Sequence, residues 1–259
     1  MAESQALLHE HQDGILRLTI NRPERRNALS LALLDRIAAQ LAAHRDDPGL
    51  RLVVVTATGE RAFAAGGDLK ELDAVRDETQ ALAMSRRGRA ALDAIRDFPL
   101  PVVAALNGLA LGGGAELAMA CDLRVAAAHA ELGFLQGRLN VTTAWGGGID
   151  LLAAAGDRAL AILLDAHRLP ANEALALGLV HRVARADEPF ADCVQDFLRP
   201  WLARSPGVLR GFKALSSAWR QALRARLASI EEGHFVSSWV HADHWEAVAR
   251  DGRERNAGR

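Results

Sequence analysis

The chain has almost no net charge, few cysteines and no long apolar run. Its 259 residues include 31 Lys and Arg against 32 Asp and Glu, which gives a formal net charge of −1. Without an excess of positive charge, nothing favours nucleic acid or an anionic membrane surface as a partner. Charges or glycines interrupt every apolar run before the roughly 20 residues that a transmembrane helix needs. We therefore expect a globular protein without a nucleic-acid or membrane partner.

Cysteine usage and the first residues indicate the compartment. The two cysteines, Cys121 and Cys193, lie in apolar helical patterns and are interpreted as reduced structural thiols. The first stretch, MAESQALLHEHQDG, lacks the basic-then-apolar order of a signal peptide. We therefore expect a cytoplasmic location.

Short apolar runs alternate with helical patterns along the chain. The runs at 51–57 (RLVVVTA) and 102–106 (VVAAL) have strand length and are typical of strands covered on both faces. Residues 5–20 predict a hairpin, and Ser30 predicts a helix N-cap. This alternation predicts an α/β core. The mostly helical pattern after about residue 145 needs a partner surface, either its own core or a neighbouring subunit.

The stretch GLALGGGAELAMACDL, residues 108–123, places three glycines directly before a glutamate. Glycine weakens a helix by roughly 1 kcal/mol, and a carboxylate among apolar residues is costly unless paired or protonated. As a strand-to-helix turn, the glycines would expose backbone N–H groups to a substrate, as in an oxyanion hole. Glu116, one turn after Gly113, would share that face and exchange a proton with an enolate. The alternative is a helix–strand packing site with Glu116 in solvent.

A second glycine turn, in RAFAAGGDLKEL at 61–72, follows another buried strand. Asp68 would cap the next helix, with Glu71 three residues further on. Taken alone, this stretch is an ordinary capped helix. Two such turns, however, can face each other and each supply one N–H to a single carbonyl oxygen.

Three segments in the same order resemble the crotonase family, also called the enoyl-CoA hydratase/isomerase superfamily. They are NRPERRNALS (21–30), VVVTATGERAFAAGGDLKEL (53–72) and PVVAALNGLALGGGAELAMACDLRVA (101–126). The resemblance extends from about residue 15 to 183. It implies a crotonase-like α/β fold of repeated ββα units over residues 1–195. It also implies a helical C-terminal region over residues 196–259, used to form a trimer or a dimer of trimers.

The resemblance also implies an acyl-CoA thioester as substrate, with coenzyme A as part of that substrate and no other cofactor. By position, the N–H groups of Gly67 and Gly113 would form the oxyanion hole, and Glu116 would be the acid/base. The positions that would contact the substrate are Arg25, Arg26, Ala65, Gly66, Asp68, Lys70, Gly112 and Trp145. For Trp145, core packing is an equally good interpretation.

One segment departs from the family's pattern. Family hydratases use a second glutamate twenty residues after the first, in a segment like FGxPE, but LGFLQGRLNV has Gln136 there. An amide has no titratable proton near neutral pH, so it can position a water but cannot take that water's proton. Three reactions remain open: double-bond isomerisation by Glu116 alone, hydration with Gln136 holding water, and decarboxylation of an alkylmalonyl-CoA ester.

The combination of RDFPLPVVAALNGLALGGGAEL (96–117), CDLR (121–124) and AWGGG (144–148) is most similar to the branch of the family that decarboxylates ethylmalonyl- or methylmalonyl-type CoA esters. An ionised Glu116 would, however, repel the carboxylate of such a substrate.

Two other kinds of site have weaker support. His241 and His244 are three residues apart, but no third ligand is evident, so we expect no metal site. A non-catalytic CoA-binding role remains open because of Gln136, although Glu116 and the two glycine turns favour an enzyme. In the C-terminal region, Trp239 and Trp245 either anchor a subunit interface or pack in the core.

Overall fold

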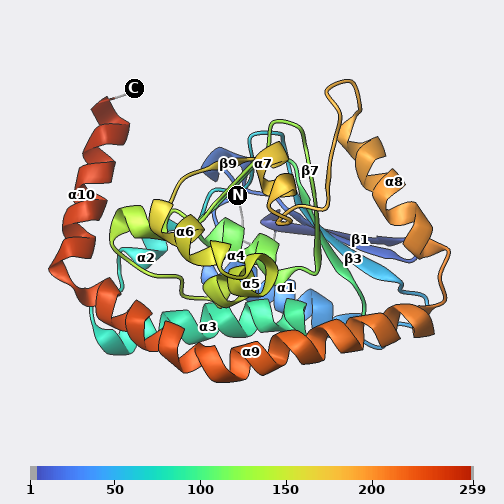
Figure 1. Cartoon of the computed structure of the whole chain (residues 1–259), viewed down its shortest axis with the longest axis horizontal. Helices are drawn as coiled ribbons and strands as arrows, with labels where there is room; N and C mark the ends of the chain where they lie inside the picture. Colours follow the sequence, from blue (N-terminus) through green and yellow to red (C-terminus); the bar gives the residue numbers. More distant parts are fainter. Residues whose placement is uncertain (1–4, 258–259) are drawn as a thin grey trace.

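The computed structural model describes residues 5–257, except for the side chains of residues 69, 70 and 254–257. Two sheets form its centre (Figure 1). The larger sheet has the order β1 (Leu7–Gln12), β2 (Ile15–Ile20), β3 (Leu52–Ala57), β5 (Val102–Leu106), β7 (Leu123–Ala126), β10 (Arg182–Val183). The smaller sheet has the order β4 (Ala62–Ala64), β6 (Leu109–Leu111), β8 (Glu131–Gly133), β9 (Leu169–Pro170). All neighbouring strands are parallel except the pairs β1–β2 and β8–β9.

Three successive units each contribute one strand to each sheet. Strands β3, β5 and β7 lie in the larger sheet, and the strand that follows each of them, β4, β6 or β8, lies in the smaller one. Helical segments complete the units: α2 (Leu69–Leu72) and α3 (Glu78–Arg96), then α4 (Gly113–Ala120), then η3 (Gln136–Leu139) and α5 (Gly147–Ala155). The expected α/β fold of repeated ββα units is confirmed.

The apolar runs form strands that are buried on both faces. Successive side chains of a strand point to opposite faces, so Val53 and Val55 of β3 join the main core while Val54 joins a second cluster. Helices α1 (Leu31–Ala43) and α3 pack on the main-core side, and α8 (Phe190–Leu202) packs on the other. The predicted hairpin is present as the antiparallel pair β1–β2. The predicted N-cap is also present: Ser30 Oγ accepts from Leu33 N at 3.2 Å. Cys121 and Cys193 are buried and unpaired.

The C-terminal part of the chain is helical. After α6 (Arg158–Asp165) and α7 (Ala171–Ala176), the chain continues through α8 into α9 (Pro206–Val240) and α10 (Ala242–Ala257). One further short helix, η2 (Pro23–Arg25), lies near the start of the chain. Helix α9, 35 residues long, runs beside α3, and α10 turns away from its end (Figure 1). The boundary that we expected at residue 195 falls inside α8. The division into two regions therefore stays a prediction.

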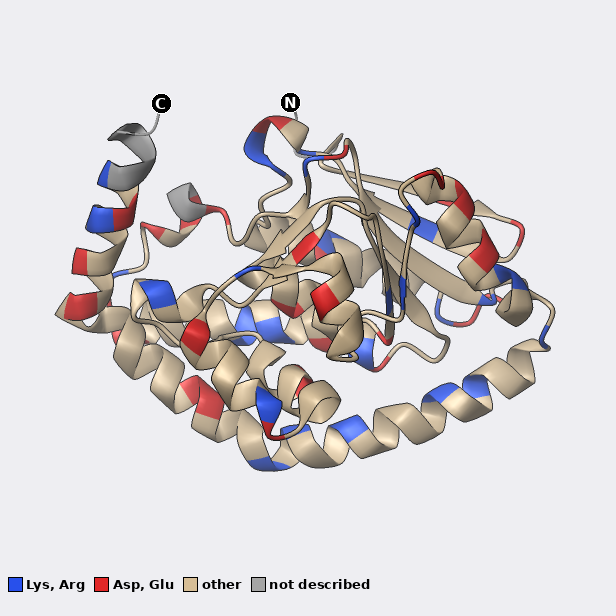
Figure 2. Ribbon diagram, turned by 45° about the horizontal axis from the view of Figure 1, so that its top comes forward, with Lys and Arg blue, Asp and Glu red and all other residues tan. Residues whose placement is uncertain are grey.

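Charged residues of both signs are spread over the molecule (Figure 2). Basic residues mark the first part of α9, and acidic residues follow nearer α10. Several of these side chains are buried and paired: Lys213 Nζ lies 2.6 Å from Asp122 Oδ1, and Arg220 Nη2 lies 2.8 Å from Asp150 Oδ1. These ion pairs fix α9 to the core. None of the helices in the described part has the length and apolar character needed to cross a membrane.

Candidate active site

A cavity of about 680 Å³ lies where the two glycine turns, η3 and the C-terminal helices meet. All the predicted site residues line it apart from Lys70, whose side chain lies outside the described part of the structure. Those lining residues are Arg25, Arg26, Ala65, Gly66, Gly67, Asp68, Gly112, Gly113, Glu116, Gln136 and Trp145. Residues far apart in the sequence therefore meet in one cavity.

The two glycine turns face each other, as expected from the sequence. Strands β4 and β6 pair in parallel, so the turns that follow them lie side by side. A Cβ added to Gly112 would lie 3.9 Å from Gly66 Cα. Gly66 has a φ of +119° and Gly112 a φ of +53°, a region that side chains rarely adopt. The backbone conformation therefore requires glycine at both positions, while the 3.9 Å distance is an ordinary contact between the two turns.

The backbone N–H groups of Gly67 and Gly113 have no acceptor among the described residues. Gly67 forms a parallel bridge with Leu29, in which Gly66 O accepts from Leu29 N and Asp68 N donates to Leu29 O. Because the neighbouring peptides make these bonds, the N–H of Gly67 points to the opposite side. Gly113 is the first residue of α4, so its N–H has no partner within the helix. Two donors in the cavity wall are therefore left without a protein acceptor.

Glu116 is buried beside these donors, with an exposed fraction of 2%. Its Oε2 accepts from Trp145 N at 2.8 Å and from Gly147 N at 3.0 Å. Its Oε1 accepts from Gln136 Nε2 at 3.0 Å and from Ala144 N at 3.4 Å. The alternative in which Glu116 points to solvent is wrong.

The surroundings of Glu116 raise its pKa from 4.5 to about 7. Burial is the largest cause, because it disfavours the charged form, and the nearby charge of Glu231 adds to it. The backbone N–H groups of Trp145, Gly147 and Ala144 act in the opposite direction. The balance leaves a carboxyl that can both give and take a proton near neutral pH.

Gln136, at the start of η3, lies directly beside Glu116. Its amide nitrogen donates to the carboxyl, which assigns the other amide atom, Oε1, as an acceptor. This Oε1 is buried and has no partner among the described residues. The structure thus brings together the two positions that the sequence resemblance paired, with an amide at the second one.

Trp145 both packs in the core and lines the cavity, so the two interpretations of this residue hold together. Its indole lies across two glycines: a Cβ on Gly88 of α3 would lie 2.2 Å from Nε1, and a Cβ on Gly113 would lie 2.5 Å from Cζ3. Its carbonyl accepts from Arg96 Nη2 at 2.7 Å. The backbone N–H of Trp145 donates to Glu116, so the packing of the indole also positions that backbone donor.

An arginine that sequence reasoning missed holds the first glycine turn. Asp68 Oδ2 accepts from Arg22 Nη2 at 2.6 Å and from Arg25 Nη1 at 3.0 Å. Arg22 lies in the same loop as the predicted Arg25 and Arg26, but no pattern set it apart. Arg25 is 47% exposed despite this pair, so part of its side chain can reach a ligand at the cavity mouth.

The C-terminal helices supply an aromatic wall of the cavity. Phe235 and Trp239 of α9 line it together with His244 and Trp245 of α10. The ring of Trp239 lies 5.4 Å from that of Phe235 and 4.7 Å from that of His244, and Arg76 Cζ lies 3.8 Å from the centre of the Trp245 ring. Within one chain, both tryptophans therefore pack against the cavity wall.

His244 Nδ1 lies 2.6 Å from the carbonyl oxygen of Leu139, so it donates to a backbone acceptor. The described residues contain no group of three or more His, Cys, Asp or Glu side chains that could hold a metal ion.

Known proteins are similar to this chain in sequence and in fold. The sequence profile of the family described as enoyl-CoA hydratase/isomerase matches residues 10–250. The chain is 31% identical to the crotonyl-CoA hydratase of Syntrophomonas wolfei, covering 97% of this chain and 96% of that protein. It is 33% identical to the mitochondrial methylglutaconyl-CoA hydratase of Rattus norvegicus, covering 93% and 78%. A solved enoyl-CoA hydratase/isomerase from Xanthobacter autotrophicus Py2 superposes with a TM-score of 0.85 at 30% identity, covering 98% and 96%. The chain therefore belongs to the enoyl-CoA hydratase/isomerase family, within the crotonase superfamily.

Proposed function

We propose that this chain acts on an acyl-CoA thioester through an enolate whose oxygen accepts hydrogen bonds from Gly67 N and Gly113 N. The observation that carries the proposal is the pair of unaccepted N–H groups beside a buried carboxyl with a pKa of about 7. In other enzymes, removing one donor of such a hole costs about 3–4 kcal/mol of transition-state stabilisation. Coenzyme A would extend past Arg25 and Arg26 at the cavity mouth, where the guanidinium groups suit its phosphates.

Glu116 would be the single acid/base of the reaction. Its four hydrogen-bond donors fix its position, and its pKa makes both protonation states available at pH 7. Gln136 would orient a water or substrate group but would transfer no proton.

Decarboxylation of an alkylmalonyl-CoA ester suits this set of residues, because it needs an enolate site and one proton donor. The bond between Cα and the carboxylate breaks, CO₂ leaves, and the electron pair remains as the enolate. Glu116 then gives its proton to Cα and is reprotonated by solvent. The pKa of about 7 weakens the objection that Glu116 would repel the substrate carboxylate, because a large fraction of molecules carry the neutral carboxyl at pH 7.

Hydration of a 2-enoyl-CoA is the second candidate, since the named relatives above are hydratases. In that reaction Gln136 would hold the water while Glu116 moves the only proton that a side chain can carry. A turnover assay by mass spectrometry, with ethylmalonyl-CoA and crotonyl-CoA side by side, separates the two. Loss of CO₂ with little hydration supports the decarboxylase. Hydration at ordinary enzymatic rates contradicts it.

Glu116→Gln tests the role of the carboxyl in either reaction. Turnover should fall by at least about 100-fold, because a general acid/base typically contributes that much, while binding of coenzyme A should persist. Unchanged turnover would refute Glu116 as the acid/base. Absence of turnover in the unaltered protein, with binding retained, would support the non-catalytic alternative.

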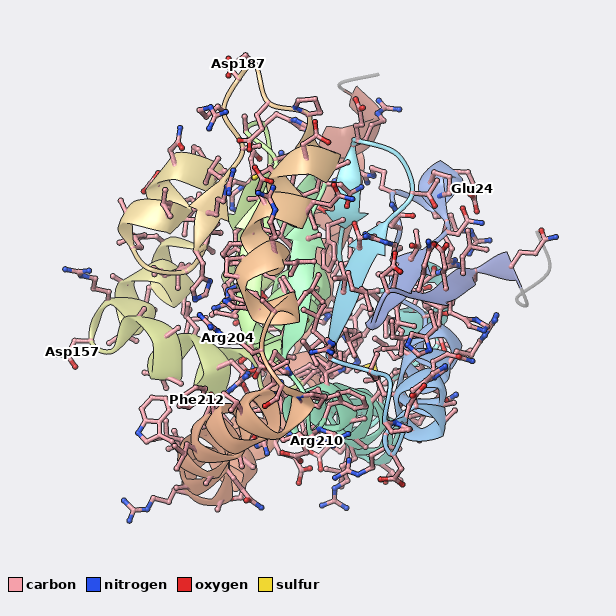
Figure 3. All side chains as sticks on the ribbon, turned by 90° about the vertical axis from the view of Figure 1, so that its right-hand side faces the viewer. Glu24, Asp157, Asp187, Arg204, Arg210 and Phe212 are labelled. Carbon is pink, nitrogen blue, oxygen red and sulfur yellow. The ribbon has the colours of Figure 1, made fainter. Side chains whose placement is uncertain are left out.

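We also infer that α9 carries the contact between copies of this chain in a trimer or dimer of trimers. Five apolar side chains share one helical face, because their spacings match successive turns. They are at least 46% exposed in the single chain: Val208, Phe212, Leu215, Trp219 and Ile230. Figure 3 shows Phe212 projecting outward from α9. A cytoplasmic location remains a prediction from the sequence.

A further inference from the structure

Residues 143–148, called here the 143–148 loop, consist of a loop and the first two residues of α5, and they lie between two buried carboxylates. Gly147 N donates to Glu116 Oε2, while the next amide, Gly148 N, donates to Glu231 Oε1 at 3.1 Å. Glu231 comes from α9, and its side chain is only 8% exposed. Consecutive backbone N–H groups therefore donate hydrogen bonds to carboxylates from two different helices.

The glycines of this loop leave room for both carboxylates. A Cβ on Gly147 would lie 2.3 Å from Glu116 Cγ. A Cβ on Gly148 would lie 2.6 Å from Thr143 Oγ1 and 3.1 Å from Glu231 Oε1. Because a side chain at either position would collide with a carboxylate or its hydroxyl partner, the loop can approach both carboxylates only through glycine.

Glu231 is itself firmly held. Its Oε1 accepts from Thr143 Oγ1 at 2.6 Å, and its Oε2 accepts from Arg89 Nη2 at 2.7 Å. Arg89, on α3, is 12% exposed and also donates to Ala144 O at 3.3 Å. Arg89 of α3 and Glu231 of α9 thus hold the loop in place through hydrogen bonds.

We propose that Glu231 is a positioning residue for Glu116: paired with Arg89, it fixes the loop whose N–H groups hold the catalytic carboxyl and places a negative charge behind that loop. Its role in catalysis rests on the proposed function of Glu116. Since like charges disfavour one another, Glu231 keeps Glu116 protonated to higher pH, in agreement with the raised pKa. Arg89 limits this effect by partly neutralising Glu231.

Other charged groups face the same loop and must stay unchanged in a test. Arg96 of α3 reaches the carbonyl of Trp145 and is paired with Asp150 of α5 at 2.8 Å. On the side of η3 the neighbour is the neutral amide of Gln136. Variants at Glu231 and Arg89 leave all of these in place.

Infrared spectra against pH, recorded on the whole protein without substrate, test the proposal directly. The C=O band of the protonated Glu116 carboxyl is assigned by its loss in Glu116→Gln. Glu231→Gln should lower the titration midpoint of that band by about one pH unit, because a like charge is removed. Arg89→Gln should raise the midpoint, because Glu231 loses its counter-charge. Opposite shifts are not expected if the pair merely supports the fold.

The neighbouring ion pair Arg86–Glu232 provides a matched control. It joins the same two helices at 2.9 Å, but Arg86 is 63% exposed, and in the described part of the chain the hydrogen bonds of this pair run between the two side chains and not to the loop. Glu232→Gln should leave the midpoint where it is. A folded Glu231→Gln with an unchanged midpoint, or shifts of the same sign in Glu231→Gln and Arg89→Gln, would overturn the proposal. If Glu231→Gln does not fold, the direction of the shift in Arg89→Gln decides.

The same variants separate this proposal from the proposed function. Where acyl-CoA turnover is found, the limb of the kcat/KM profile that Glu116 sets should move with the infrared midpoint: the alkaline limb where Glu116 gives a proton, as in decarboxylation, and the acid limb where it first takes one. If the midpoint responds as expected but no thioester is converted, the positioning role holds and the proposed function fails.

Discussion

Replacing Glu116 with Gln should change how the stability of the fold depends on pH. In the unfolded chain this carboxyl loses its proton near pH 4.5, whereas in the folded chain burial and Glu231 hold its pKa at about 7. Between these values the folded state retains a proton that the unfolded state has lost, so raising the pH through this window favours unfolding. A shift from 4.5 to about 7, at about 1.4 kcal/mol per unit, corresponds to about 3–4 kcal/mol over the full range of pH.

The test is the free energy of unfolding in urea at several pH values between 5 and 8, at one protein concentration, for the wild type and Glu116→Gln. The variant also loses hydrogen bonds at this site, but that loss does not depend on pH. The difference between the two proteins should therefore move by about 2–3 kcal/mol in favour of the variant from pH 5 to pH 8, because the part of the effect below pH 5 lies outside this range. Glu246→Gln, at an exposed site of α10, is the matched control. A difference that stays constant across this range would refute the reasoning.

Three further predictions concern packing, chemistry and assembly. Gly88→Ala should lower stability by about 1–2 kcal/mol, because its Cβ would displace the buried Trp145 indole, whereas Gly252→Ala, with open space around it, should raise stability by about 0.5–1 kcal/mol. Thermal melting checks both, and a Gly88→Ala protein as stable as wild type would contradict the packing argument. Gln136→Glu should create a second carboxyl within hydrogen-bond distance of the first and raise crotonyl-CoA hydration at least tenfold, measured by loss of the enoyl absorbance. Phe212→Lys should shift the protein to a smaller species in sedimentation velocity, since it places a charge within the exposed apolar stripe on α9, and an unchanged mass would exclude that face as the contact.

The sequence predicted the elements whose signal is local. The apolar runs at 51–57 and 102–106 form central strands because both faces of the sheet are covered, which removes any alternation with polar residues. The proximity of the two glycine turns was also predictable, because each turn follows a buried strand at the equivalent position of successive units.

The second half of the site was not predictable, because its signal is not local. Glu231 lies in a long helix among ordinary charged residues, and only the fold brings it to the loop that holds Glu116. Arg89 likewise belongs to the stretch RRGR (86–89) on α3, in which the side chains of Arg86 and Arg87 are exposed. For Trp239, helical periodicity predicts an apolar face but not which surface that face meets. In the structure, Trp239 lines the cavity of its own chain.

The aromatic wall has a consequence for the order in which the protein becomes active. The glycine turns, Glu116 and Gln136 are all synthesised before α9 and α10, yet Phe235, Trp239 and Trp245 enclose the cavity from those last helices. A nascent or prematurely terminated chain that stops before α9 would carry the reactive carboxyl without the wall that excludes water from it, and without Glu231. The cavity is therefore complete only once α9 and α10 have folded against the rest of the chain.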